Sequence, residues 1–130
     1  MIDTSALIAA LIVEHEHHVI ARRSLTATTR IPVIVMTEAF SQLRRTFGQS
    51  ARSASQLLQP WATVERLIPT TADVTATVLG RAAELDLGGN VHDALIAQVC
   101  AEGGVPLVTL DGRQHRIALA LGVASTYLIA

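Results

Sequence analysis

Lysine is absent from this sequence, and all ten basic residues are arginine. A phospho-receiver domain needs a lysine beside its phosphate, so that class of protein is excluded. Aromatic residues make up only 3% of the chain, which argues against a platform on which single-stranded nucleic-acid bases stack. The formal net charge is −1 at pH 7, so any binding of nucleic acid must depend on local groups of residues.

Cysteine and long apolar runs are also scarce. Cys100 is the only cysteine, which excludes an internal disulfide, and its apolar surroundings predict a buried thiol. The longest apolar run, ALIAALIV at residues 6–13, is far too short to span a bilayer. No basic segment precedes the first apolar residues, so we expect no signal peptide and a cytoplasmic protein without a membrane partner.

The residues that are present predict one α/β domain over residues 1–130. Half of them are apolar, and short apolar runs alternate with longer helical patterns, as in a short central parallel sheet of four to five strands flanked by helices. The expected strands are 1–2, 31–35, 64–69, 105–110 and 125–129. The expected helices are 6–13, 16–28, 36–48, 50–60, 71–89, 92–104 and 112–122.

Four acids recur at comparable places in this pattern. Asp3 and Asp111 directly follow expected strands, Glu38 lies near the start of the helix after the second strand, and Asp93 opens the sixth helix. Ligands of parallel α/β sheets bind at the carboxyl ends of the strands, so we expect the four carboxylates to converge there. Each acid alone also has a simpler interpretation, as a helix cap, a turn residue or a solvated helix residue.

Converging carboxylates repel one another, so packing them together either raises their pKa values or requires a cation. Hard divalent ions accept oxygen ligands and keep several of their waters. A cluster of carboxylates without His or Cys in matching places therefore favours Mg²⁺ or Mn²⁺ over Zn²⁺.

Three segments carry a family resemblance: IDTSAL at 2–7, TEAFSQL at 37–43 and HDALIAQVCAEGGVPLVTLD at 92–111. Together, in this order, they resemble PIN-domain ribonucleases of the VapC toxin type over essentially the whole chain. The opening strand is shorter than is usual in that family, so either the strand is reduced to two residues or the start codon lies upstream.

The resemblance implies a PIN-like fold, Mg²⁺- or Mn²⁺-dependent cleavage of RNA, a homodimer and inhibition by a small cognate antitoxin. Thr4 corresponds to the small hydroxyl residue beside the first acid, and Thr109 to the hydroxyl two residues before the last. The family's acidic metal-binding positions fall on Asp3, Glu38, Asp93 and Asp111.

Separate roles follow from the chemistry of phosphodiester hydrolysis, in which metal ions activate water and neutralise charge. We expect Asp3 to be the central ligand, with Asp93 and Asp111 holding the same ion partly through water. Glu38 is expected to orient or deprotonate the attacking water. Arg113 follows Asp111 closely and is the favoured phosphate contact, since arginine suits phosphate, although a solvated helix face is an alternative.

Other interpretations remain open. The segment EHEHH at 14–18 has a spacing that zinc sites use, but a solvated loop and helix start explains it better because no partner motif follows. A haloacid-dehalogenase-type phosphatase is excluded because Ser5 stands where its second aspartate is needed. Two alternatives stay within the resembled fold: a non-catalytic binding scaffold, and a nuclease of RNA processing outside a toxin–antitoxin system.

Overall fold

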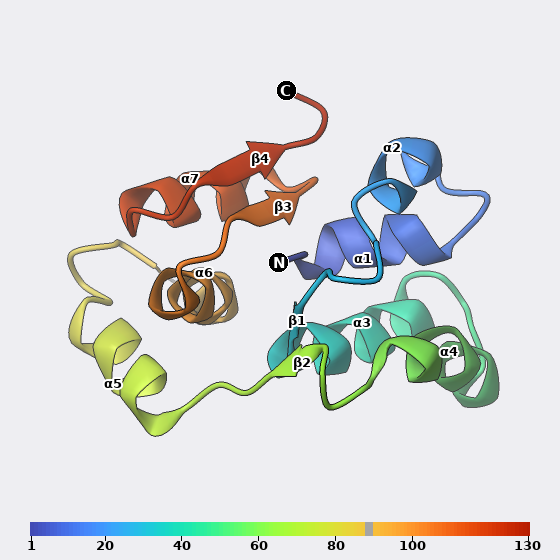
Figure 1. Ribbon diagram of the computed structural model, residues 1–130, viewed down its shortest axis with the longest axis horizontal. Helices are drawn as coiled ribbons and strands as arrows, with labels where there is room; N and C mark the ends of the chain where they lie inside the picture. The colour runs from blue at the N-terminus through green and yellow to red at the C-terminus, as the bar shows by residue number, and fades with distance from the viewer. Residues whose placement is uncertain (88–89) are drawn as a thin grey trace.

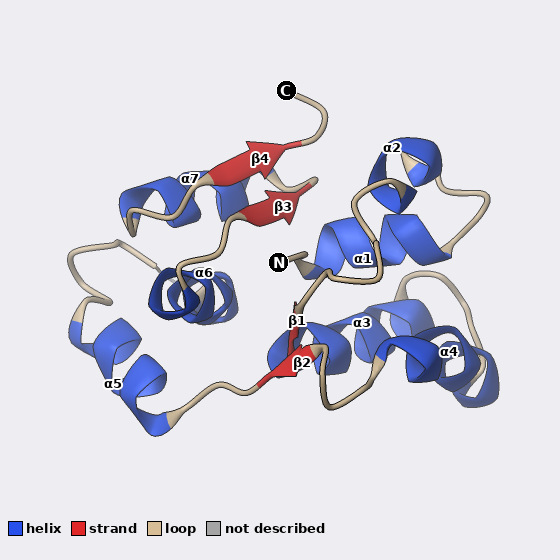
Figure 2. Ribbon diagram, in the orientation of Figure 1, coloured by secondary structure: helices blue, strands red, loops and turns tan. Residues whose placement is uncertain are grey.

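Two short parallel ladders lie near the middle of the molecule, with helices around them (Figures 1 and 2). The computed structural model describes residues 1–87 and 90–130. β1 pairs with β2, and β3 pairs with β4. The bounds of the strands are β1 Ile31–Pro32, β2 Leu67–Ile68, β3 Leu107–Thr109 and β4 Ser125–Tyr127.

The N-terminal residues lie between β1 and β3 and connect the two ladders (Figure 1). Ile2 forms a parallel bridge with Val108, and the Asp3 N–H donates to the Val108 carbonyl at 3.1 Å. On the other side, the Ile2 N–H donates to the Arg30 carbonyl at 3.3 Å. The predicted α/β fold with short parallel strands is therefore confirmed, but the sheet is split into two ladders joined by this segment.

Helices account for most of the remaining chain, and α1 packs against both α2 and α3. No helix among the described residues is long and apolar enough to cross a membrane. The helices are α1 Thr4–Leu11, α2 His18–Arg22, α3 Val33–Arg45, α4 Ala51–Leu58, the 3₁₀ turn η1 Gln59–Trp61, α5 Ala72–Gly80, α6 Val91–Gly103 and α7 Gly112–Ala120.

The expected strand 31–35 is mostly wrong, because α3 already begins at Val33. Val35, Ala39 and Leu43 are fully buried and lie four residues apart, so the apolar run belongs to the buried stripe of a helix. A short apolar run of this kind fits a strand or a helix equally well by periodicity alone. Because α3 begins three residues earlier than expected, Glu38 lies in its second turn and not in its first.

Several other elements are shorter than predicted, and the strands expected at 105–110 and 125–129 keep only the three residues each of β3 and β4. α2 covers five residues of the expected helix 16–28, and the strand expected at 64–69 is reduced to β2. α5 ends at Gly80, after which turns bring buried Leu87 back onto Val78, and the Leu87 N–H donates to the Ala82 carbonyl. The end of the expected helix 71–89 falls partly on Gly88 and Gly89, which lie outside the described residues.

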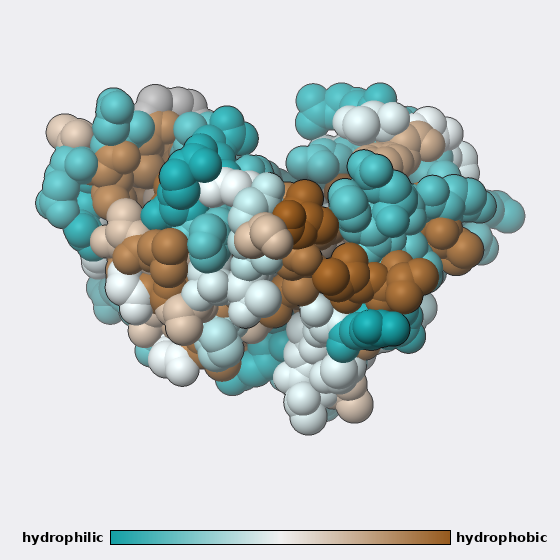
Figure 3. Space-filling view, turned by 90° about the horizontal axis from the view of Figure 1, so that it is seen from above, coloured by the Kyte–Doolittle hydropathy of each residue, from teal (hydrophilic) through white to brown (hydrophobic). Residues whose placement is uncertain are grey.

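The core is built largely from α1, α3 and α6 together with β1 and β3. Cys100 lies within it, and burial raises the pKa of its thiol to about 11, as expected for an unreactive cysteine. Apolar side chains also reach the surface: on the face in Figure 3 they gather between two mainly hydrophilic ends of the molecule. Fully buried large side chains include Ile2, Leu7, Ile31, Leu43, Ile96 and Leu107.

Candidate functional site

The four acids singled out in the sequence line one cavity of about 200 Å³, although they come from distant parts of the chain. Asp3 follows the bridged residue Ile2, and Asp111 follows β3 after one residue. Because these two segments run parallel and are neighbours, they carry both acids to the same edge. Glu38 reaches the cavity from α3, and Asp93 from the first turn of α6.

Asp3 is the most deeply buried of the four, with 3% of its surface exposed. Its Oδ1 accepts hydrogen bonds from the Ala6 N–H at 2.9 Å and from the Ser5 hydroxyl at 2.9 Å, and its Oδ2 accepts from the Thr109 hydroxyl. Burial raises the pKa of Asp3 to about 6, against the effect of these donors. Asp3 therefore caps α1, as its simpler interpretation proposed, and also lines the cavity.

Two hydroxyl groups connect Asp3 to the turn after β3. Thr109 Oγ1 accepts from the Asp111 N–H at 2.9 Å, and Ser5 Oγ accepts from the Leu110 N–H at 3.1 Å. Thr109 is fully buried, so its two bonds satisfy groups that water does not reach. The hydroxyl groups thus hold the first and last acids in a fixed relation.

Glu38 and Asp93 both line the cavity, and the pKa of each carboxyl group is raised. Burial is the main cause that raises the pKa of both carboxyl groups, and the charge of Asp93 further raises that of Glu38. The neighbouring charge of Asp111 raises the pKa of Asp93 in the same way. Thr4 Oγ1 donates to Glu38 Oε1 at 3.2 Å, which fixes one oxygen of this carboxylate.

Arg113 lies beside the last two acids. Its Nε is 3.3 Å from Asp93 Oδ2, and its Nη2 is 4.0 Å from Asp111 Oδ2. Asp111 also caps α7 by accepting from the Arg113 N–H at 2.9 Å. The guanidinium offsets part of the negative charge of the cavity, while about half of the Arg113 side chain stays exposed. Its expected contact with phosphate stays a prediction.

Several residues that line the cavity were not predicted: Ser5, Gln42, Ile96 and Gln114. Gln114 is buried, and its Nε2 donates to the Asp93 carbonyl at 2.8 Å. Gln42 and Ile96 follow Glu38 and Asp93 by one helical turn, so this spacing was a usable signal. Nothing in the sequence distinguishes Ser5 from an ordinary residue in the first turn of a helix.

The donor set fits a hard divalent cation held through water. Within residues 1–87 and 90–130, no three Asp, Glu, His or Cys side chains are arranged as direct ligands of one ion. The cavity nevertheless presents carboxylate oxygens from four elements and is large enough for several waters. Mg²⁺ usually keeps several waters and binds one or two carboxylates directly, so Asp3, Asp93 and Asp111 could hold it in this way.

The histidines of EHEHH have local partners. His18 Nδ1 lies 2.9 Å from the Ala9 carbonyl oxygen, His17 lies 3.5 Å from the Glu16 carboxylate, and His15 packs beside Phe47. Near the other end of the chain, His115 bonds Ser125 and stacks on Tyr127. These contacts account for the positions of the histidine rings without a metal.

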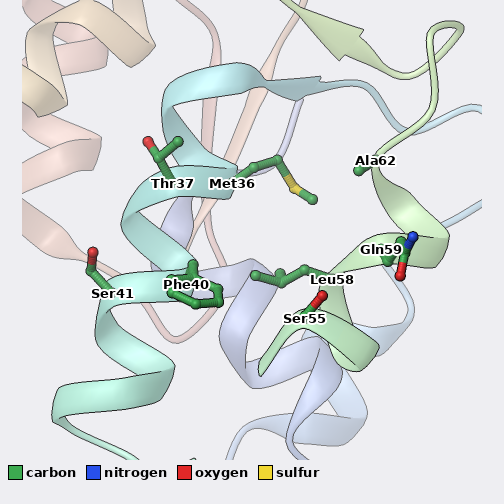
Figure 4. A pocket seen from close by; sticks show the side chains of 8 residues that line it. All are labelled: Met36, Thr37, Phe40, Ser41, Ser55, Leu58, Gln59 and Ala62. Atoms are coloured by element: carbon green, nitrogen blue, oxygen red, sulfur yellow. The ribbon is translucent and has the colours of Figure 1, made fainter. Parts of the chain in front are cut away.

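A second, larger hollow lies between α3 and α4 and is mainly apolar (Figure 4). Its volume is about 570 Å³. Phe40 and Met36 extend from α3 toward Leu58 on the opposite wall, whereas Thr37 and Ser41 point to the other side of the helix (Figure 4). The four acids are not among its lining residues, so this groove is distinct from the carboxylate cavity.

Known proteins place this geometry in a family. A solved structure described as FitAB bound to an IR36 DNA fragment has the same fold, with a TM-score of 0.68 and 16% sequence identity. The alignment covers 96% of this chain and 92% of that one. No curated protein sequence matches. The sequence matches the PIN domain family over residues 1–119, and the chain therefore belongs to the PIN domains, which are typically metal-dependent nucleases.

Proposed function

We propose that this protein is a Mg²⁺- or Mn²⁺-dependent endoribonuclease and the toxin of a type II toxin–antitoxin pair. The observation that carries the proposal is that Asp3, Glu38, Asp93 and Asp111 line one cavity of a PIN domain. Acids with buried, repelling carboxylates destabilise a fold unless a cation offsets their charge. Their joint presence at one site therefore supports a cation-dependent function.

We assign the four acids separate roles in phosphodiester hydrolysis. When bound, the divalent cation lowers the pKa of water and neutralises charge on the attacking and leaving oxygens. Asp3, held by three donors, provides a rigid central carboxylate, and Asp93 and Asp111 add oxygens from the side of α6 and α7. Glu38 orients or deprotonates the attacking water, and its raised pKa makes it a better base.

The hydroxyl residues position these carboxylates rather than react. Thr4 fixes Glu38 Oε1, and Thr109 joins Asp3 to the backbone of Asp111. Arg113, already beside Asp93 and Asp111, is the nearest arginine able to hold a phosphate oxygen of the substrate once a cation has taken over the two acids.

The partners proposed from the resemblance are a small cognate antitoxin and a second copy of this chain. The similar solved structure contains FitAB on a DNA fragment, which supports a function within an assembly that includes another protein. We propose RNA as the substrate of this chain and the cytoplasm as its location. DNA binding belongs to that neighbour and is not carried over to this chain.

One observation favours a second candidate, a non-catalytic binding scaffold. Among the described residues no three acids are arranged as direct ligands of one ion, and Arg113 already neutralises part of the cavity. Titration calorimetry with MgCl₂ and MnCl₂ separates the candidates. A nuclease binds the cation, and Asp93→Asn weakens that binding. Absence of heat with both salts would favour the scaffold.

The test of activity is Asp93→Asn with Asp73→Asn as its matched control. Both acids lie in the first turn of a helix, but Asp73 is exposed on α5 and does not line the cavity. We expect Asp93→Asn to remove RNA cleavage in Mg²⁺ and Asp73→Asn to retain it, with both variants folded by circular dichroism. Sequencing of RNA ends after induced expression gives the cellular readout, and full turnover by Asp93→Asn would end the assignment.

A further inference from the structure

A second polar hollow opens beside the carboxylate cavity along α3. Its volume is about 400 Å³, and it shares Glu38 and Gln42 with the cavity that holds the four acids. Its other lining residues are Thr37, Ser41, Arg45 and His92. Because the two hollows share these wall residues, they are direct neighbours along α3.

The hollow brings further hydrogen-bond donors beside the acids. The cavity presents four carboxylates, which accept hydrogen bonds and attract cations. The neighbouring hollow shares Glu38 and Gln42 with it and adds a guanidinium, two hydroxyl groups and an imidazole, from Arg45, Thr37, Ser41 and His92. Such groups donate to anionic oxygens, and a guanidinium does so with a planar pair of N–H groups that matches phosphate.

Arg45 is free to take this role. Its side chain is exposed and forms no salt bridge or hydrogen bond with any residue in the described part of the chain. Arg113, which lines the carboxylate cavity, is by contrast paired with Asp93. Glu38, Gln42 and Arg45 are spaced four and three residues apart on α3, which places the arginine on the face that carries the acid.

We propose that Arg45 and the hollow around it form a phosphate subsite for a nucleotide next to the scissile bond of a single-stranded RNA. The subsite rests on the proposed nuclease function. It adds to that function because it implies a single-stranded RNA that extends past the acids along α3. Thr37 and Ser41 line both this hollow and the edge of the apolar groove, and they add two hydroxyl groups along α3 beside Arg45.

The neighbouring residue Arg44 provides a matched control. It lies on the same helix, is exposed, carries the same charge and does not line the hollow; its Nη1 lies 3.4 Å from the Gln49 carbonyl oxygen. Arg45→Ala and Arg44→Ala therefore make the same change in net charge. Arg45→Lys keeps the charge and removes the planar fork.

The measurement is fluorescence anisotropy of a labelled, unstructured RNA 12-mer with the full-length chain in EDTA, where metal-dependent cleavage stops. We expect Arg45→Ala to weaken binding about tenfold and to lower the slope of log K against log salt by about 0.7, the value for one phosphate contact on a single strand. Arg44→Ala should change the affinity less than about twofold, and Arg45→Lys should fall between them.

Cleavage by the same variants in Mg²⁺ distinguishes the two proposals. A subsite beside the scissile bond predicts a higher KM for Arg45→Ala with kcat little changed. Equal effects of Arg44→Ala and Arg45→Ala on binding would overturn the subsite while leaving the nuclease intact. RNA binding that depends on Arg45 without cleavage by the wild type would overturn the nuclease and keep the subsite. Absence of RNA binding by the wild type in EDTA would overturn the subsite, and cleavage by the wild type in Mg²⁺ would then decide the nuclease separately.

Discussion

Two of the hollows beside α3 differ in almost every physical respect. The carboxylate cavity is small, polar and built from buried charge, whereas the groove toward α4 is nearly three times as large and mainly apolar. Glu38 and Gln42 face the first, Met36 and Phe40 face the second, and Val35, Ala39 and Leu43 are buried between them. α3 thus separates the carboxylate cavity, whose buried charges lower the stability of the fold, from the apolar groove, which has little effect on it.

The comparison shows which of the two hollows lowers the stability of the fold. Burying a carboxylate without a cation is unfavourable, and the raised pKa values of Asp3, Glu38 and Asp93 record that cost. A half-exposed phenylalanine such as Phe40 carries no comparable penalty, because most of a folded surface is apolar in any case. The polar cavity is therefore the more costly of the two to build, which is what a site for binding a cation requires.

The largest expected effect is the pH dependence of stability that Asp3 creates without metal. Its ordinary pKa of 3.8 rises to about 6 in the folded chain, so the folded state binds more protons between these values and stability falls as pH rises from 4 to 6. The difference corresponds to about 3 kcal/mol, complete above pH 6. Urea denaturation in EDTA at pH 4 to 7 measures it, with Asp3→Asn as comparison. Parallel curves for the two proteins would contradict the prediction.

A smaller effect is expected when the buried support of the acids is removed. Thr109→Val keeps the shape of the side chain but removes one of the three donors to the Asp3 carboxylate and leaves the Asp111 N–H without its side-chain acceptor. We expect a loss of about 1–3 kcal/mol in the free energy of unfolding at pH 7, together with a further rise in the pKa of Asp3. Thr109→Ser retains the hydroxyl and should lose much less. Equal losses for both variants would show that packing of the methyl group, and not the hydroxyl, matters.

The smallest effect belongs to the apolar groove. Phe40 is 37% exposed, so Phe40→Ser should lower the free energy of unfolding by only about 1 kcal/mol. RNA cleavage should be unchanged, because Phe40 does not line the carboxylate cavity. Urea denaturation and a cleavage assay on the same preparation test both halves of the prediction. A large loss of cleavage with normal stability would contradict the prediction and show that the apolar groove contributes to the same function as the carboxylate cavity.

The sequence was sufficient for the order of the elements and for the acids, and insufficient for their boundaries. Asp3 and Asp111 could be placed because each follows an apolar strand, and parallel strands end at one edge. The start of α3 could not be predicted, because residues 33–35 fit a strand or a helix equally well. Only the burial of Val35, Ala39 and Leu43 in the folded chain shows that they belong to a helix. The end of α5 depends on contacts of Leu87 that no local pattern specifies.

Contacts within the site were less predictable than its members. Ser5 bonds both Asp3 oxygens and the Leu110 backbone, and only the fold brings the start of α1 to the turn after β3. The closeness of Arg113 to Asp111 in the sequence places it near the site. Its contact with Asp93 cannot be predicted in this way, because it requires α6 and α7 to lie side by side. The fractional burial that shifts the pKa values likewise arises from tertiary packing.

The junction between the two ladders consists of the bridge from Ile2 to Val108 on one side and one hydrogen bond from Ile2 to Arg30 on the other, and the hydroxyl bonds of Thr109 and Ser5 begin one residue beyond the bridge. Fraying of that junction would separate Asp3 from Asp111 before the rest of the chain melts. Hydrogen exchange at the Asp3 and Val108 amides therefore reports directly on how long the four carboxylates stay together, and any molecule that binds across the junction also sets the fraction of time for which they do.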